Sequence, residues 1–150
     1  MRRRFYCEIL TPSGEVSKAE TTHVRFPASD GQMGIMGGHA PLVARMGAGL
    51  VQIDVPDEQP LQYFISGGFA QMHESTLTLL AEECTPLEEM TPEQAWEDLA
   101  EARDLPRETP EQEAYREQAI EAARIKFRIV QKVRGKPAVA GAEQEEDAWD

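Results

Sequence analysis

Short runs of alternating hydrophobic and polar residues fill most of the first 86 positions of the chain. In the run LVQIDV at residues 50–55, Val51, Ile53 and Val55 share one face and the polar residues between them share the other. Alternation with a period of two is typical of a half-buried β-strand. The runs FYCEIL, THVRF, LQYFIS, FAQM and TLTLLA are also short and rich in β-branched and aromatic residues.

Turn signals separate these runs. The segments PSGE, SDGQ, PDEQP and HEST hold the glycine, proline, aspartate and serine residues that favour turns. Many short strands at this spacing, with no helical period between them, predict an antiparallel β-sandwich or flattened barrel over residues 1–86.

The hydrophobic period changes after this region. Residues 87–134 contain no glycine, and the motif TPEQ occurs at residues 91–94 and again at 109–112. In each copy the threonine can cap a helix, the proline takes the first helical position, and the glutamine can reach back to the cap. Because Pro106 ends the first helix, the two starts predict a helical hairpin over residues 87–134. The fold class is therefore mainly β plus α.

The helices are expected at residues 92–105 and 110–134. The first carries an apolar strip of Ala95, Leu99 and Ala102, with Trp96 beside it. The second carries a broader apolar side, made of Tyr115, Ala119, Ala122, Ala123, Phe127, Val130 and Val133. This breadth predicts a partner beyond the first helix. Residues 135–150 are rich in Gly, Pro and acidic residues and are expected to be a disordered acidic tail.

Composition narrows the possible functions. The 150-residue chain has a formal net charge of −12, which argues against nucleic-acid binding because such binding needs a basic face. Neither a signal peptide nor an apolar run of about 18 residues is present, so we expect a soluble cytoplasmic chain. Cys7 and Cys84 lie far apart in apolar runs and are expected to be buried thiols rather than a disulfide.

The glycine-rich stretch at residues 31–50, GQMGIMGGHAPLVARMGAGL, contains the histidine that first suggests catalysis. A catalytic His39 would need an orienting group and a nucleophile, and no motif joins it to the nearby Ser29 or Asp30. The glycines match no phosphate-binding motif, and the three histidines lack metal-ligand spacing. We therefore expect no cofactor and no metal, and we favour a structural or docking role for His39.

A basic stripe, defined as Arg124, Arg128 and Lys132, recurs every fourth residue on the second predicted helix. At this spacing the three side chains share one face. Two interpretations stay open: a solvated helix face, or a surface that binds an acidic partner.

The run DGQMGIMGGHAPLVARMGAGLVQI, followed by YFISGGFAQMHESTLTLLAEE, resembles the epsilon subunit of bacterial F-type ATP synthases, called delta in mitochondria. The resemblance covers about residues 5–134. It implies a non-catalytic rotor subunit of a proton-translocating complex, located at the cytoplasmic face of the bacterial inner membrane. Membrane association would then arise only through the complex.

The resemblance also implies partners and contact residues. Gln32, Met33 and His39 would lie on the side of the sandwich that meets the c-ring and the gamma subunit. The basic stripe would meet an acidic segment of a beta subunit, within the head formed by alpha and beta, and so block ATP hydrolysis.

The chain departs from the family in three places. Some members bind ATP through Ile/Leu-Asp-x-x-Arg-Ala, and here Thr91 and Gln94 replace the aspartate and the arginine. Because a phosphate loses its charged partner, we expect weak or absent ATP binding. Gly37 stands where proline is common, which predicts a looser loop, and the acidic tail is outside the usual pattern.

Two other functions stay open from the sequence. A free-standing β-sandwich adaptor would be stable and monodisperse without gamma and would not co-purify with membranes. An enzyme that uses His39 would lose its activity on His39→Ala while its partners remained unaffected.

Overall fold

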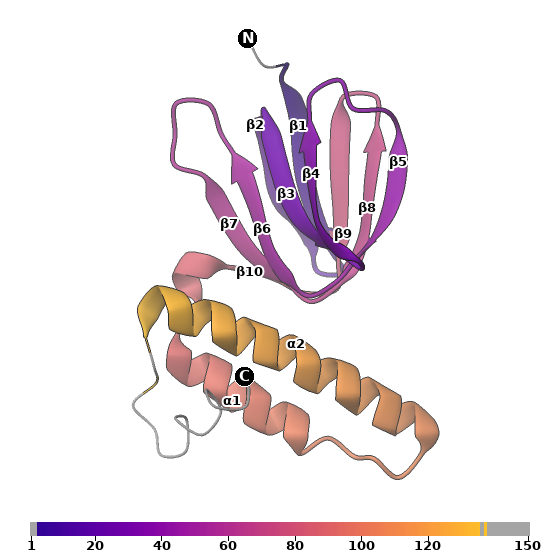
Figure 1. Cartoon of the computed structure of the whole chain (residues 1–150), viewed down its shortest axis with the longest axis vertical. Coiled ribbons are helices and arrows are strands. Elements are labelled where there is room, and N and C mark those ends of the chain that lie inside the picture. Colours follow the sequence, from indigo (N-terminus) through magenta and orange to yellow (C-terminus); the bar gives the residue numbers. More distant parts are fainter. Residues whose placement is uncertain (1–2, 136, 138–150) are drawn as a thin grey trace. The chain divides into compact units, whose positions relative to one another are not determined.

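The computed structural model describes residues 3–135 and 137. The chain divides into two compact units, Met1–Glu88 and Glu89–Asp150, and each is described by itself. The first unit is a β-sandwich and the second contains two helices, so the expected fold class is confirmed (Figure 1). The predicted disordered tail, residues 135–150, lies almost entirely outside the described residues.

The first unit contains ten strands. They are β1 (Phe5–Thr11), β2 (Gly14–Thr21), β3 (His23–Ala28), β4 (Gly31–Met36), β5 (Leu42–Met46), β6 (Gly49–Asp54), β7 (Leu61–Ile65), β8 (Gly68–His73), β9 (Thr76–Ala81) and β10 (Cys84–Pro86).

One continuous sheet folds into two layers. The first layer has the order β10-β7-β6-β3-β4 and the second has the order β5-β8-β9-β1-β2. A single residue pair, Ala28 with Met46, joins β3 of the first layer to β5 of the second. All neighbouring strands are antiparallel except β1 and β9, which are parallel.

The core lies between the two layers and follows the alternation seen in the sequence. Cys7, Ile53 and Leu79 are fully buried, as are Val24, Phe26, Ile35, Val51, Ala70 and Leu77. Burial raises the pKa of the Cys7 thiol to about 12, and the neighbouring Glu8 contributes to this shift. Cys84 is only half-buried at the short strand β10, where burial and then Glu83 raise its pKa to about 11.

Strands β2, β4 and β5 were not predicted from the sequence. β4 has the sequence GQMGIM, and its two glycines are typical of turns. It nevertheless pairs with β3 along its whole length, from Ala28–Gly31 to His23–Met36. Tertiary pairing thus overrides the local preference of this segment for turns.

The second unit contains α1 (Pro92–Arg103) and α2 (Pro110–Arg134), preceded by the 3-10 turn η1 (Leu87–Glu89). Helix α1 ends two residues before the predicted position, because residues that precede Pro106 disfavour the helical conformation. The complete capping box forms only at α2, between Thr109 and Gln112. At α1, Thr91 caps the backbone N–H of Gln94, but the Gln94 side chain donates to Asp98 instead.

The two helices pack as an antiparallel hairpin. Leu99, Ala102 and Ala123 form its small apolar centre. The rings of Trp96 and Phe127 lie 5.6 Å apart, and Lys126 Nζ donates to Asp98 Oδ2 at 2.9 Å.

The predicted apolar side of α2 is only partly buried. Ala123, Phe127 and Val130 are buried, whereas Tyr115 and Val133 are 65% and 56% exposed. Helix α1 has 12 residues and α2 has 25. At about 1.5 Å per residue, α1 covers only about half of the length of α2. Helix α1 therefore leaves Tyr115 and Val133 uncovered, and the further partner expected for this apolar side stays a prediction.

Candidate docking surfaces

Gln32 and Met33 lie near the start of strand β4 rather than in a turn. They directly follow the turn at Ser29 and Asp30, and they pair with Pro27 and Phe26 of β3. Gln32 is exposed, whereas Met33 packs against the core of the sandwich. Only Gln32 therefore offers its whole side chain to a partner.

His39 lies in the loop between β4 and β5 and is exposed. Its Nδ1 lies 2.7 Å from the carbonyl oxygen of Ala40, so this nitrogen carries the proton that is donated. His39 also lines a surface hollow together with Arg3 and Met72. Ser75 lines the same hollow, of about 470 Å³, yet no hydrogen bond joins it to His39 among the described residues.

The glycine pair before His39 makes room for the start of the chain. A Cβ at Gly37 would lie 2.8 Å from the carbonyl carbon of Arg3, and one at Gly38 would lie 2.7 Å from Arg3 Nη1. Gly38 also has a φ of +84°, a conformation that favours glycine. Arg3 thus packs directly against this loop, which is at odds with the looser loop expected from Gly37.

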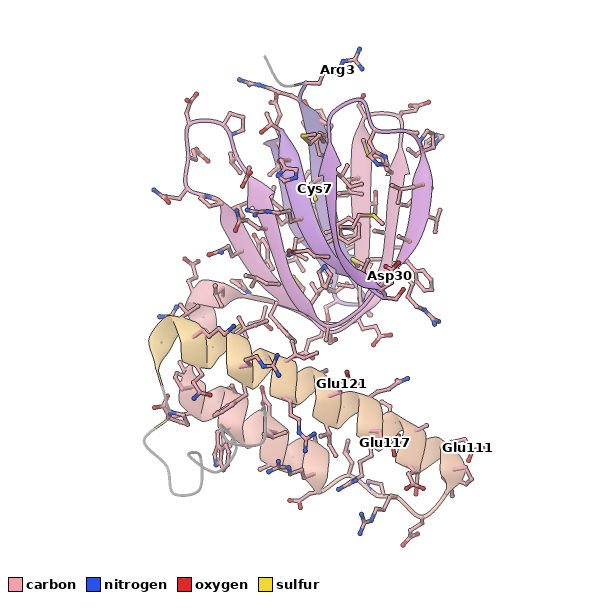
Figure 2. All side chains as sticks on the ribbon, in the orientation of Figure 1. Arg3, Cys7, Asp30, Glu111, Glu117 and Glu121 are labelled. Atoms are coloured by element: carbon pink, nitrogen blue, oxygen red, sulfur yellow. The ribbon has the colours of Figure 1, made fainter. Side chains whose placement is uncertain are left out.

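The structure does not bring Gln32 and Met33 together with His39. Strand β4 separates them, and from Gln32 to Met36 it advances about 13 Å at 3.3 Å per residue. Figure 2 shows Asp30, beside Gln32, at one end of the sandwich and Arg3, beside the His39 loop, at the other. The three residues therefore form two surfaces rather than one.

The three residues of the basic stripe are exposed on one face of α2. Arg116 and Arg103 lie next to each other, since Arg116 donates from Nε and Nη2 to the carbonyl oxygen of Arg103 at 3.2 and 3.1 Å. Burial lowers the pKa of Arg103, and the charges of Arg124 and Arg116 lower it further. Cations thus gather locally on the hairpin, although residues 87–134 carry 12 acidic and only 8 basic residues.

The charged residues of α2 also stabilise the helix itself. Figure 2 shows Glu111, Glu117 and Glu121 along the first half of α2, and the basic stripe occupies the second half. Acidic residues near a helix N-terminus and basic residues near its C-terminus both stabilise the helix dipole. This effect is strongest in the terminal turns, so it explains Lys132 better than Arg124.

Thr91 and Gln94 are engaged in helix capping. The Thr91 hydroxyl accepts from the Gln94 backbone, and the Gln94 amide donates to Asp98 Oδ1 at 3.0 Å. Neither side chain carries a charge that could pair with a phosphate. The expectation of weak ATP binding therefore stays a prediction.

Sequence analysis missed an exposed row on the outer face of the second layer. Strand register places Arg45 beside Phe69, Phe69 beside Leu80, and Leu80 beside Leu10. Glu15 of β2 lies opposite Leu10 and completes the row. We call these five residues the outer row. Phe69 and Leu80 are 49% and 46% exposed, and Arg45 Cζ lies 5.8 Å from the centre of the Phe69 ring.

A hollow of about 370 Å³ lies along this row, and Leu10, Phe69 and Leu80 are among its lining residues. One sequence signal marks it: Leu80 directly follows Leu79, so the alternation of TLTLLA breaks. Only one of two adjacent strand residues can face the core, and the register shows that it is Leu79.

The described residues contain no group of three or more histidine, cysteine, aspartate or glutamate side chains that could hold a metal ion. Within the same part of the chain, no helix is long and apolar enough to span a membrane.

The chain combines a β-sandwich with a capped helical hairpin, and it presents separate polar, basic and apolar surfaces. These features are typical of a docking subunit in a larger assembly. A family model described as the β-sandwich domain of the ATP synthase delta/epsilon chain matches residues 4–86. The chain belongs to the ATP synthase delta/epsilon family, and it is an epsilon-type, non-catalytic rotor subunit of the central stalk.

Individual relatives agree with this assignment. The ATP synthase epsilon chain of Rhodopirellula baltica is 33% identical over 122 residues, which cover 81% of this chain and 94% of that protein. The ATP synthase epsilon chain of Paracoccus denitrificans is 33% identical over 116 residues, which cover 77% and 78%.

Two solved structures share the fold. One is the Euglena gracilis mitochondrial ATP synthase, OSCP/F1/c-ring in rotational state 1. Its similar chain has a TM-score of 0.67 at 24% identity, covering 87% of this chain and 81% of that one. The other is the central stalk and c-ring of the Tetrahymena thermophila mitochondrial ATP synthase. Its TM-score is 0.65 at 12% identity, with coverage of 86% and 98%.

Proposed function

We propose that the β-sandwich of this chain links the gamma subunit to the c-ring of a proton-translocating F-type ATP synthase. The observation that carries the proposal is the similarity to an epsilon chain along 94% of that protein's length. The two exposed ends of β4 support it, because a link between two partners needs two separate surfaces. Gln32 and Met33 would serve one partner and the His39 loop the other.

The membrane contact would run through these partners. The hydrophobic residues of the sandwich mostly fill its own core, and no described helix could span a bilayer. We place the complex at the cytoplasmic face of a bacterial inner membrane, with the sandwich against the c-ring.

The hairpin would regulate the complex. We assign the basic stripe to an acidic segment of a beta subunit, where its binding blocks ATP hydrolysis. Support comes from the exposure of Arg124, Arg128 and Lys132 in a chain whose net charge is −12. A localised cationic surface on an acidic protein favours one orientation of docking on an acidic partner.

The first experiment is a pull-down of the tagged chain from detergent-solubilised membranes of its own host, with partners identified by mass. Recovery of gamma together with alpha, beta and c subunits is the expected result. Recovery of a soluble partner alone would support the adaptor function and contradict the proposal. Loss of an enzymatic activity on His39→Ala, with partner binding intact, would support an enzyme instead.

The regulatory part needs its own test in the assembled complex. The triple variant Arg124→Ala, Arg128→Ala, Lys132→Ala is expected to raise ATP hydrolysis, as is truncation after Leu87. Glu111→Ala, Glu117→Ala, Glu121→Ala on the same helix is the matched control and should not relieve inhibition. Equal hydrolysis by all three variant complexes and the wild type would rule out an inhibitory hairpin.

A further inference from the structure

The outer row has a charge at each end and an apolar centre. Arg45 marks one end, Glu15 the other, and Phe69, Leu80 and Leu10 lie between them in strand register. Adjacent strands are about 4.8 Å apart, so the row crosses five strands and extends about 19 Å. Large exposed hydrophobic side chains that lie contiguously on a surface indicate a binding site.

Backbone pairing on this face restricts how a partner can bind. Strands β8, β9 and β1 each pair with a neighbour on both sides, so their backbone groups serve the sheet. A segment bound over these three strands must therefore be recognised by side chains, because an added strand would need a free edge, and only β2 at the end of the row is a terminal strand. The row also runs across the strands rather than along one of them.

An α-helix satisfies these conditions. Its pitch of about 5.4 Å is close to the strand spacing, so apolar side chains one turn apart can contact Phe69, Leu80 and Leu10 in succession. A length of about 19 Å corresponds to about 13 helical residues. The charges at the ends of the row select the direction in which such a helix lies.

We propose that the outer row binds an amphipathic helix of another subunit of the same assembly. This helix crosses the strands with an acidic group beside Arg45, an apolar face over the central residues, and a basic group beside Glu15. The inference rests on the proposed function, because it requires the chain to assemble in the stalk. It identifies a third docking surface, separate from both ends of β4.

Leu80→Ser and Tyr6→Ser form a matched pair for the test. Both side chains point outward from the same layer and are similarly exposed, at 46% and 48%, but Tyr6 lies outside the outer row. Each variant is titrated into host ATP synthase stripped of its epsilon-type subunit. Leu80→Ser is expected to weaken binding at least about tenfold and Tyr6→Ser less than about twofold. Equal effects would overturn the proposal.

Charge variants test the orientation and remain informative if Leu80→Ser does not fold. Arg45→Glu and Glu15→Lys should each weaken binding and reduce its dependence on salt. Lys18→Glu, on β2 but outside the row, is the control. Binding that is unchanged by both row variants would contradict the proposed orientation.

A photo-crosslinking residue at position 69 identifies the occupant. The expected product is a peptide of another stalk subunit with apolar residues at helical spacing. Crosslinking to a second copy of this chain would instead make the row a dimer interface, and crosslinking to its own hairpin would make it an internal contact. Either result overturns the proposal. Failure of the wild-type chain to bind the stripped complex would instead contradict the proposed function.

Discussion

Gly68 is the position where the sandwich backbone leaves least room for a side chain. Its φ is +131°, and an added Cβ would collide with the carbonyl oxygen of Leu80 on the neighbouring strand. The glycine therefore permits β8 and β9 to pair closely where the outer row crosses them.

Gly68→Ala is expected to destabilise the sandwich by roughly 3 kcal/mol, since backbone strain and overpacking each cost on the order of 1–3 kcal/mol. Gly14→Ala is the control, because Gly14 has a similar φ of +126° but no atom within 4 Å of an added Cβ. It should cost about 1 kcal/mol from strain alone. Urea denaturation followed by β-sheet circular dichroism measures both, and equal losses would show that the collision with Leu80 is relieved.

At the residue scale, the sequence predicted inward-facing positions better than functional ones. Alternation identified Val51 and Ile53 as buried, and both are. It could not identify the outer row, because recognising Leu80 as exposed requires the register of β9 against β1 and β8. Likewise, the sequence alone could not show that β4 separates Gln32 from the loop that carries His39.

At the element scale, a partly buried ion pair between Asp98 and Lys126 links the two helices of the hairpin. Asp98 and Lys126 side chains are 25% and 12% exposed, and Asp98 also accepts from Gln94. Partial burial reduces solvent screening, and the pair aligns the two helices in register.

A double-mutant cycle with Asp98→Asn and Lys126→Met should give a coupling of about 1–2 kcal/mol. Arg4 and Glu20 provide the comparison, because their side chains are 57% and 44% exposed and 3.4 Å apart. Exposed pairs contribute less, so that coupling should be at most about 0.5 kcal/mol. Thermal unfolding monitored separately for helix and sheet measures the two cycles, and similar couplings would contradict the role of burial.

The helices were predictable because their caps are local. Thr91 and Thr109 both serve as N-caps, as the repeated TPEQ motif predicted. Strands β2 and β4 were not predictable, because their polar and glycine residues resemble turns and each is stabilised by pairing with the strand before it. Strand β5 pairs with β8, which lies more distant in the sequence.

At the scale of the whole molecule, the order of a sandwich followed by a hairpin was predictable, and the family match at residues 4–86 agrees with it. The docking residues themselves remain proposals. A surface is defined by its partner as much as by its own chain, and the fold alone does not specify which exposed face is used.

The whole chain is expected to bind ATP weakly, and calorimetric titration should detect no binding at micromolar ATP. Thr91→Asp combined with Gln94→Arg restores the two charges and is expected to increase the affinity. Aspartate also caps a helix well, so α1 should persist in the variant. Micromolar affinity of the wild-type chain would contradict the prediction.

The parallel pairing of β1 with β9 has a consequence for synthesis on the ribosome. The Glu8 side chain contacts Thr78, a residue 70 positions later. β1 can pair with β2 almost at once, but at roughly 10 residues per second it waits about 7 s for β9 to be made. Such distant pairing also folds slowly, whereas the local contacts of the hairpin form quickly. The nascent sandwich therefore leaves the β9-facing edge of β1 unpaired for seconds, the interval in which a chaperone protects it best.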